Sequence, residues 1–186
     1  MSFPHAIGRR ELLKAALVGT VALAGPPGFL RPALARTFPD GRLSLYNLHT
    51  EERLEVTYRH PSGAYDPDTL AALNRLLRCH YSGRVASMDV RVIEFLAAVD
   101  RRLGGPHEIH VISGYRSPEY NDRLIRRGRG VAEHSLHMDG MAIDVRIPAV
   151  GLDALRRAAL SLGSGGVGYY PRSGFIHLDS GRPRSW

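Results

Sequence analysis

The sequence contains little cysteine, little lysine and no long apolar run. Its 186 residues include one cysteine, Cys79, which excludes a disulfide framework and a cysteine-rich zinc site. Lys14 is the only lysine, and the other strongly basic residues are arginines, which stay charged. The apolar run at residues 15–24 is too short to cross a bilayer of about 30 Å, so we expect no stable membrane span in the mature protein. The overall composition of the sequence, 44% hydrophobic and 23% charged, is typical of a globular domain.

The first 35 residues have the pattern of an export signal. Arg9 and Arg10 precede the apolar run, and Ala33-Leu34-Ala35 matches an A-x-A cleavage site. The arginine pair followed by Leu-Leu-Lys resembles a twin-arginine signal; the alternatives are an ordinary secretory signal or a retained N-terminal anchor. We therefore expect a signal peptide at 1–35, a short linker at 36–41, one domain at 42–186, and a periplasmic location.

The hydrophobic pattern of that domain predicts an α+β fold with a mainly antiparallel sheet and flanking helices. Extended runs occupy residues 42–48, 53–59, 108–112, 141–147, 165–170 and 175–179, and the first two are predicted to form a hairpin. Helices are predicted after Asp66-Pro67, after Ser87, after Ser117-Pro118 and over 152–162, with Asp66 and Ser87 as caps. Cys79 is expected as a small packed residue on the first of these helices.

Two of the nine histidines have a carboxylate at an informative position. His137 precedes Asp144 by seven residues, Asp144 lies within the expected strand 141–147, and His177 lies within 175–179. If those strands are neighbours, Asp144 and His177 can point to the same face, and His137 can approach from the loop. The other histidines have no partner at a comparable spacing, and surface or packing roles are the simpler interpretation.

Two histidines and one carboxylate form a known catalytic zinc set, in which water takes the fourth position. A structural zinc ion usually has four protein ligands, which a chain with one cysteine does not readily supply. Zinc bound by nitrogen and oxygen donors lowers the pKa of its water towards ~7. The spacing alone is weak support, because a histidine seven residues before an aspartate often occurs by chance.

A longer pattern strengthens the interpretation. Residues 135–144 read Ser-x-His-x-x-Gly-x-Ala-x-Asp, and with the late His177 they resemble the zinc motif of the M15 peptidases, which share a core with the Hedgehog signalling domain. More closely, the chain resembles the DUF882 family, the murein endopeptidase K group. The matching stretches are 46–50 (YNLHT), 112–117 (ISGYRS), 129–132 (RGVA), 165–173 (GGVGYYPRS) and 175–179 (FIHLD).

The resemblance implies a Hedgehog and D-Ala-D-Ala-peptidase-like fold and one zinc ion per chain, held by His137, Asp144 and His177. It implies hydrolysis of peptidoglycan cross-links, with D,D- or L,D-carboxypeptidase action less favoured. Arg116, in Gly-Tyr-Arg-Ser, corresponds to an arginine that steadies the substrate or the developing oxyanion. The competing interpretation of Arg116 is a surface ion pair.

The general base is predicted less directly. Many M15 enzymes have a glutamate three residues before the last histidine ligand, where this chain has Gly174. Asp179 lies two residues after His177, on the same face of a strand, and is favoured as the base over second-shell support of a ligand.

Other residues near the motif have two interpretations each. Ser135 either orients the loop and contacts substrate or is a turn residue, and Tyr169 and Tyr170 either line the cleft or pack in the core. A basic run at the third helix either attracts anionic cell-wall polymer or a membrane surface, or forms a solvated face; its residues are Arg123, Arg126, Arg127 and Arg129.

Two other functional classes compete with the hydrolase. A non-catalytic zinc-containing module could bind peptidoglycan or a protein, although such a binder needs neither Arg116 nor Asp179. A nucleic-acid binder is supported only by the sequence pI of about 10.1, and the aromatic and basic residues do not interleave as in known modules, so no nucleic-acid partner is expected.

Overall fold

A computed structural model describes residues 39–128 and 130–186 of the chain. The strands in this part are β1 (Gly41–Asn47), β2 (Arg53–Arg59), β3 (Glu108–Ser113), β4 (Ala142–Arg146), β5 (Gly166–Tyr170), β6 (Phe175–Asp179) and β7 (Arg184–Ser185). The helices are α1 (Pro67–Leu76), α2 (Val90–Arg102), α3 (Pro118–Arg126) and α4 (Leu152–Leu162).

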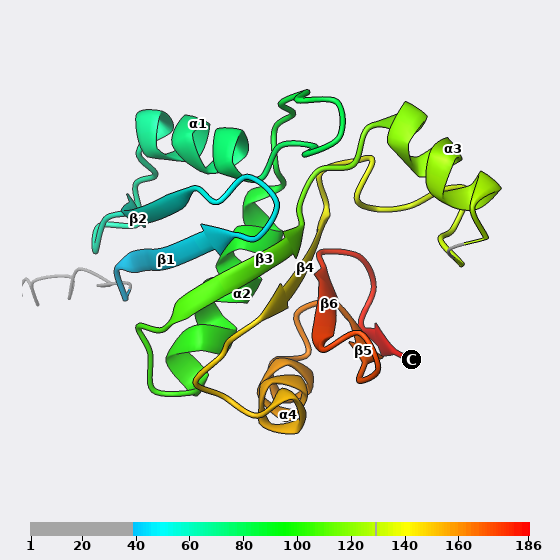
Figure 1. The fold of residues 1–186 in the computed structure, drawn as a ribbon. Coiled ribbons are helices and arrows are strands. Elements are labelled where there is room, and N and C mark those ends of the chain that lie inside the picture. The colour runs from blue at the N-terminus through cyan, green and yellow to red at the C-terminus, as the bar shows by residue number, and fades with distance from the viewer. Residues whose placement is uncertain (1–38, 129) are drawn as a thin grey trace, which may run out of the picture. The chain divides into compact units, whose positions relative to one another are not determined.

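The strands form one seven-stranded sheet in the order β2-β1-β3-β4-β6-β5-β7 (Figure 1). The β1–β3 and β5–β7 pairs are parallel and the other four pairs are antiparallel. This confirms the predicted α+β class with a mainly antiparallel sheet. It also confirms the hairpin of β1 and β2.

The hydrophobic core lies on one face of the sheet. Helices α2 and α4 pack on that face and on each other, and α1 packs on β2, whereas α3 stands apart from the sheet (Figure 1). Alternate strand residues such as Ile143 on β4 and Ile176 on β6 point into this core and are at most 1% exposed. The intervening residues of the same strands therefore point to the opposite face, where the polar groups lie.

The predicted start of the helix is confirmed at α1 but not at α2, and α1 ends at Leu76, before the predicted repeat does. The Asp66 side chain caps α1 by accepting hydrogen bonds from the backbone N–H of Asp68 and Thr69 at 3.0 and 3.1 Å. The prediction that Ser87 caps the second helix is wrong. Asp89 holds that position, because its carboxylate accepts from the N–H of Arg91 at 2.9 Å.

Cys79 is buried as predicted, at 1% exposure, but it lies beyond the end of α1 rather than on a helix. The predicted signal peptide lies outside the described residues, as do residues 36–38 of the predicted linker and Arg129 of the basic run. Among the described residues, no helix is long and apolar enough to cross a membrane.

Candidate active site

Asp144 and His177 lie side by side on adjacent strands. They are direct partners in the antiparallel β4–β6 pair, and both occupy the face of the sheet opposite the core. The prediction that their strands are neighbours is confirmed.

His137 reaches the same point from the loop that enters β4. This loop is anchored by hydrogen bonds from Arg116 N–H to His137 O at 3.0 Å and from Met141 N–H to Leu136 O at 2.9 Å. Gly140 has a φ of +67°, and a Cβ there would collide with the carbonyl oxygen of Ser87. The backbone turn that delivers His137 therefore requires glycine.

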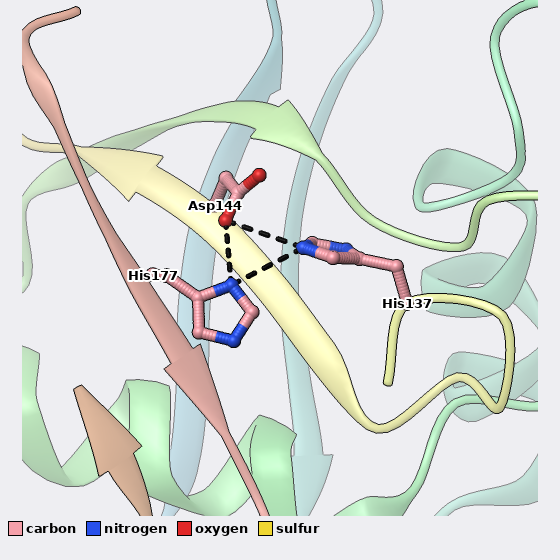
Figure 2. Close-up of side chains that lie close together, drawn as sticks. All are labelled: His137, Asp144 and His177. Carbon is pink, nitrogen blue, oxygen red and sulfur yellow. Dashed lines mark hydrogen bonds and ion pairs between the residues drawn. The ribbon is translucent and has the colours of Figure 1, made fainter. Parts of the chain in front are cut away.

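The three side chains converge through one atom each (Figure 2). His137 Nε2 lies 3.2 Å from His177 Nδ1 and 3.3 Å from Asp144 Oδ1, and His177 Nδ1 lies 2.8 Å from Asp144 Oδ1. All three residues are buried, with at most 9% exposure. In a tetrahedral zinc site with bonds of 2.0–2.1 Å, ligand atoms are about 3.3 Å apart, so the observed separations are close to those of a metal site.

The outer hydrogen bonds of both histidines leave the facing nitrogens as electron-pair donors. His137 Nδ1 lies 2.8 Å from the carbonyl oxygen of Gly114, which only accepts, so this nitrogen carries the proton. His177 Nε2 lies 3.1 Å from Asp179 Oδ2, a carboxylate that can hold the ring proton on Nε2 and leave Nδ1 to a cation. With neutral rings, two nitrogen lone pairs and the Asp144 carboxylate meet without a proton between them. A divalent cation satisfies all three, so the residues present fit zinc.

The ionisation of the cluster is consistent with this chemistry. Burial opposes ionisation of Asp144, but the charges and hydrogen bonds of His137 and His177 lower its pKa well below the ordinary value. Burial lowers the pKa of His177, but its hydrogen bonds to Asp144 and Asp179 outweigh that effect and raise it, so a proton on Nδ1 competes with a cation for that nitrogen. Asp144 is therefore a carboxylate, the form that binds a metal.

Arg116 lies beside the cluster and is not a surface ion pair. It is 7% exposed, its Nη2 lies 3.9 Å from Asp144 Oδ2, and its Nη1 donates to Asn121 Oδ1 at 3.3 Å and Ser135 Oγ at 3.5 Å. Its buried Nε–H has no hydrogen-bond partner. Burial lowers the pKa of Arg116, although a guanidinium stays charged at neutral pH.

Asp179 occupies a position that does not suit a general base. Its side chain is fully buried and accepts hydrogen bonds from Arg184 Nη1 at 2.9 Å, Arg184 Nη2 at 2.8 Å, Gly181 N–H at 2.8 Å and His177 Nε2 at 3.1 Å. Burial raises its pKa, but these bonds outweigh burial and hold the pKa far below the usual range. These contacts favour the alternative role, hydrogen-bond support of His177, over that of a base.

The cluster opens onto a cavity of about 540 Å³. Its lining includes the polar residues Arg116, His134 and Ser135 and the aromatic residues Tyr170, Phe175 and Trp186. Among the described lining residues, Asp144 is the only carboxylate and Arg116 and Arg184 are the arginines.

Of the two tyrosines predicted to line the cleft, only Tyr170 does so. Tyr169 points to the other face of β5, where its hydroxyl donates to Asp153 Oδ1 at 2.6 Å and its ring meets Arg156. Tyr169 therefore does not belong to the candidate site.

Several residues of the site carry no recognisable sequence signal. Asn121 is fully buried on α3, where its Nδ2 donates to the carbonyl oxygens of Ala132 at 3.0 Å and Glu133 at 3.3 Å. It thereby connects Arg116 to the loop before His137. Trp186 is the only tryptophan of the chain, and a lone aromatic residue far from the motif indicates no role by itself.

An α+β domain in which two histidines and a carboxylate meet at an open cavity has the donor set of the zinc hydrolases. The family model described as peptidoglycan L,D-endopeptidase MepK, of the M15 peptidases, matches residues 37–186, and the chain belongs to this family. It is 41% identical over 180 residues to the peptidoglycan L,D-endopeptidase MepK of Escherichia coli K12, covering 96% of both chains. It is also 41% identical over 145 residues to the probable peptidoglycan L,D-endopeptidase MepK of Haemophilus influenzae, covering 77% of both. No solved structure gives a significant match.

Proposed function

We propose that this protein is a zinc-dependent murein peptidase that hydrolyses amide bonds in the stem-peptide cross-links of peptidoglycan. The observation that carries the proposal is the convergence of His137, Asp144 and His177 at the edge of a cavity. The names of the relatives favour an L,D bond, such as one joining two diaminopimelate residues, over terminal carboxypeptidase action.

His137, Asp144 and His177 would hold one zinc ion per chain. When bound, zinc would supply Lewis-acid stabilisation of an oxyanion and acidify a water molecule. The three protein donors leave a side towards the cavity, which is the arrangement of a catalytic rather than a structural site. This supports a hydrolase over the non-catalytic zinc-containing binding module.

The residues around the donors have distinct roles in the proposal. The Arg116 guanidinium lines the cavity and is suited to a substrate carboxylate or to the oxygen of the scissile amide. Ser135 and Asn121 position the Arg116 guanidinium through its Nη1. Asp179 keeps the proton on His177 Nε2, so that Nδ1 faces the other donors.

The substrate implies an exported protein. We propose that residues 1–35 are a signal peptide of the twin-arginine type, that 36–41 form a linker, and that 42–186 act in the periplasm. Secretion of a reporter fused to residues 1–41 tests the route: loss of export after Arg9→Lys with Arg10→Lys supports the twin-arginine type, and unchanged export excludes it.

Incubation of the purified protein with isolated cross-linked muropeptides, analysed by mass spectrometry, tests the activity. We expect loss of cross-linked dimers, inhibition by a chelator and recovery with added zinc. His137→Ala should abolish cleavage, and His60→Ala, at an exposed histidine outside the cavity, should leave it unchanged. A zinc-loaded protein that cleaves no cross-link would contradict the proposal.

A further inference from the structure

Three aromatic side chains form a continuous wall of the cavity beside the donor cluster. The rings of Tyr170 and Phe175 stack with centroids 4.8 Å apart, and the Trp186 indole N–H donates to the Tyr170 hydroxyl at 2.8 Å. The Trp186 ring centroid lies 5.4 Å from that of His177. In this wall Trp186 is therefore the ring next to the proposed metal ligand His177, and it connects through Tyr170 to Phe175.

The position of the indole is set by the backbone. Trp186 N–H donates to Val167 O at 3.3 Å, and Tyr169 N–H donates to Trp186 O at 3.0 Å. Gly168 is the strand partner of His177, and a Cβ at Gly168 would lie 2.8 Å from the indole ring. Glycine at this position therefore makes room for the indole beside His177.

The wall exposes apolar surface in a cavity that polar side chains also line. Trp186 is 48% exposed and Tyr170 is 37% exposed, although the indole N–H is already hydrogen-bonded and Arg184 lies 4.8 Å from the Trp186 ring. The remaining surface has no polar group to offer a ligand except the Tyr170 hydroxyl. It suits an aliphatic chain, while Arg116, which also lines the cavity, suits an anionic or carbonyl group.

We propose that Trp186 and Tyr170 form a subsite for the aliphatic side chain of the diamino acid next to the scissile amide. The inference rests on the proposed function: an amide held at the donor cluster places its neighbouring residue within a few ångströms of His177, where the indole lies. In a cross-link through diaminopimelate that neighbour contributes a run of three methylene groups. Their contact with the indole removes apolar surface from water on both partners.

Intrinsic fluorescence tests ligand contact directly, because Trp186 is the only tryptophan in the chain. The probe is a stem tripeptide ending in diaminopimelate, a cleavage product that the zinc-loaded protein does not consume. We expect a saturable shift of the emission to shorter wavelength, and none with a tripeptide ending in alanine. Equal emission changes with both peptides, or with neither, would overturn the subsite.

Steady-state kinetics on a cross-linked dimer test the energetic contribution. Partial burial of three methylene groups corresponds to about tenfold in affinity, so Trp186→Ala should raise KM about tenfold with kcat within about threefold of wild type. Trp186→Phe should restore most of the loss. Tyr81→Ala, at an aromatic residue that is 49% exposed outside the cavity, is the matched control and should change neither constant.

The outcomes separate the subsite from the activity. If wild-type protein cleaves cross-links and Trp186→Ala keeps its KM, or loses zinc and kcat instead, Trp186 only supports His177 and the inference is wrong. If wild-type protein cleaves no cross-link, the proposed function is wrong, and the emission titration still decides whether the aliphatic ligand contacts Trp186.

Discussion

Replacing Asp179 by asparagine separates two roles that the same carboxylate could have. The carboxylate accepts bonds from His177 and Arg184 through both of its oxygens. Asparagine has the same shape, but it presents an NH₂ group to one of these two donors and removes the negative charge. Oδ1 also accepts from the N–H groups of Gly166 and Gly181, so the NH₂ group is expected at the Oδ2 position, where His177 loses the acceptor that holds its ring and keeps the proton on Nε2.

The expected size of the effect follows from this position. Loss of an outer hydrogen bond to a metal-binding histidine weakens metal affinity by about 10- to 100-fold, which is roughly 1.4 to 2.8 kcal/mol. Loss of a general base instead lowers the rate by about 10²- to 10⁴-fold, and added metal does not restore it. We therefore expect Asp179→Asn to need more zinc but to reach a kcat within about tenfold of wild type once saturated.

The assay is cleavage of a cross-linked muropeptide across a series of zinc-buffered solutions, with zinc affinity measured separately by chelator competition. Asp153→Asn is the matched control, because that carboxylate lies on α4 and bonds Tyr169 away from the cavity. A loss of kcat greater than about 100-fold at saturating zinc, with unchanged zinc affinity, would refute the supporting role and restore Asp179 as the base.

Three further substitutions test the surroundings of the site. Asn121→Ala should lower the free energy of unfolding by about 2 kcal/mol in urea titrations and raise KM, because buried carbonyl groups and Arg116 lose a partner; an unchanged stability would contradict this. Gly140→Ala should cost at least about 1–3 kcal/mol in thermal unfolding, since alanine there combines a φ of +67° with a collision at Ser87 O; a wild-type Tm would exclude strain at this turn. Burial lowers the folded-state pKa of His80 to about 4, so the unfolded chain binds more protons and stability falls as pH drops from about 6.5 towards 4. His80→Gln should reduce the loss of unfolding free energy between pH 7 and pH 5, and an equal loss in both proteins would contradict the assignment.

The donor cluster could be predicted from the sequence because its geometry follows from local rules. Alternation along a strand fixes which side chains share a face. Asp144 and His177 could therefore be expected to meet if their two strands were neighbours. Gly140 marked the turn that brings His137 to them. The strands and helices themselves followed from hydrophobic periodicity. The start of a helix was predicted accurately where one capping residue, such as Asp66, has no competing cap nearby.

Features that depend on contacts between distant residues could not be predicted in this way. Ser87 and Asp89 both suit a helix cap, and the choice depends on where the chain after α1 turns. The parallel β5–β7 pair that fixes Trp186 involves two residues of β7, too few to show a strand pattern. The burial of Asn121 and of Asp179 depends on which side chains cover them. The spacing of residues along the sequence does not contain that information.

The contrast between Asp144 and Asp179 shows why strand register decides chemical role. Both carboxylates lie on the same face of the sheet, and both contact His177. Asp144 is paired with His177 itself and faces the cavity, whereas Asp179 is paired with Ala142 and Gly166. A Cβ at Gly166 would collide with the Asp179 carboxylate and crowd Arg184, so the absence of a side chain there lets Arg184 reach and cover that carboxylate. One aspartate is therefore available to a cation and the other is enclosed with an arginine, although the spacing of the second from His177 had favoured it as the general base.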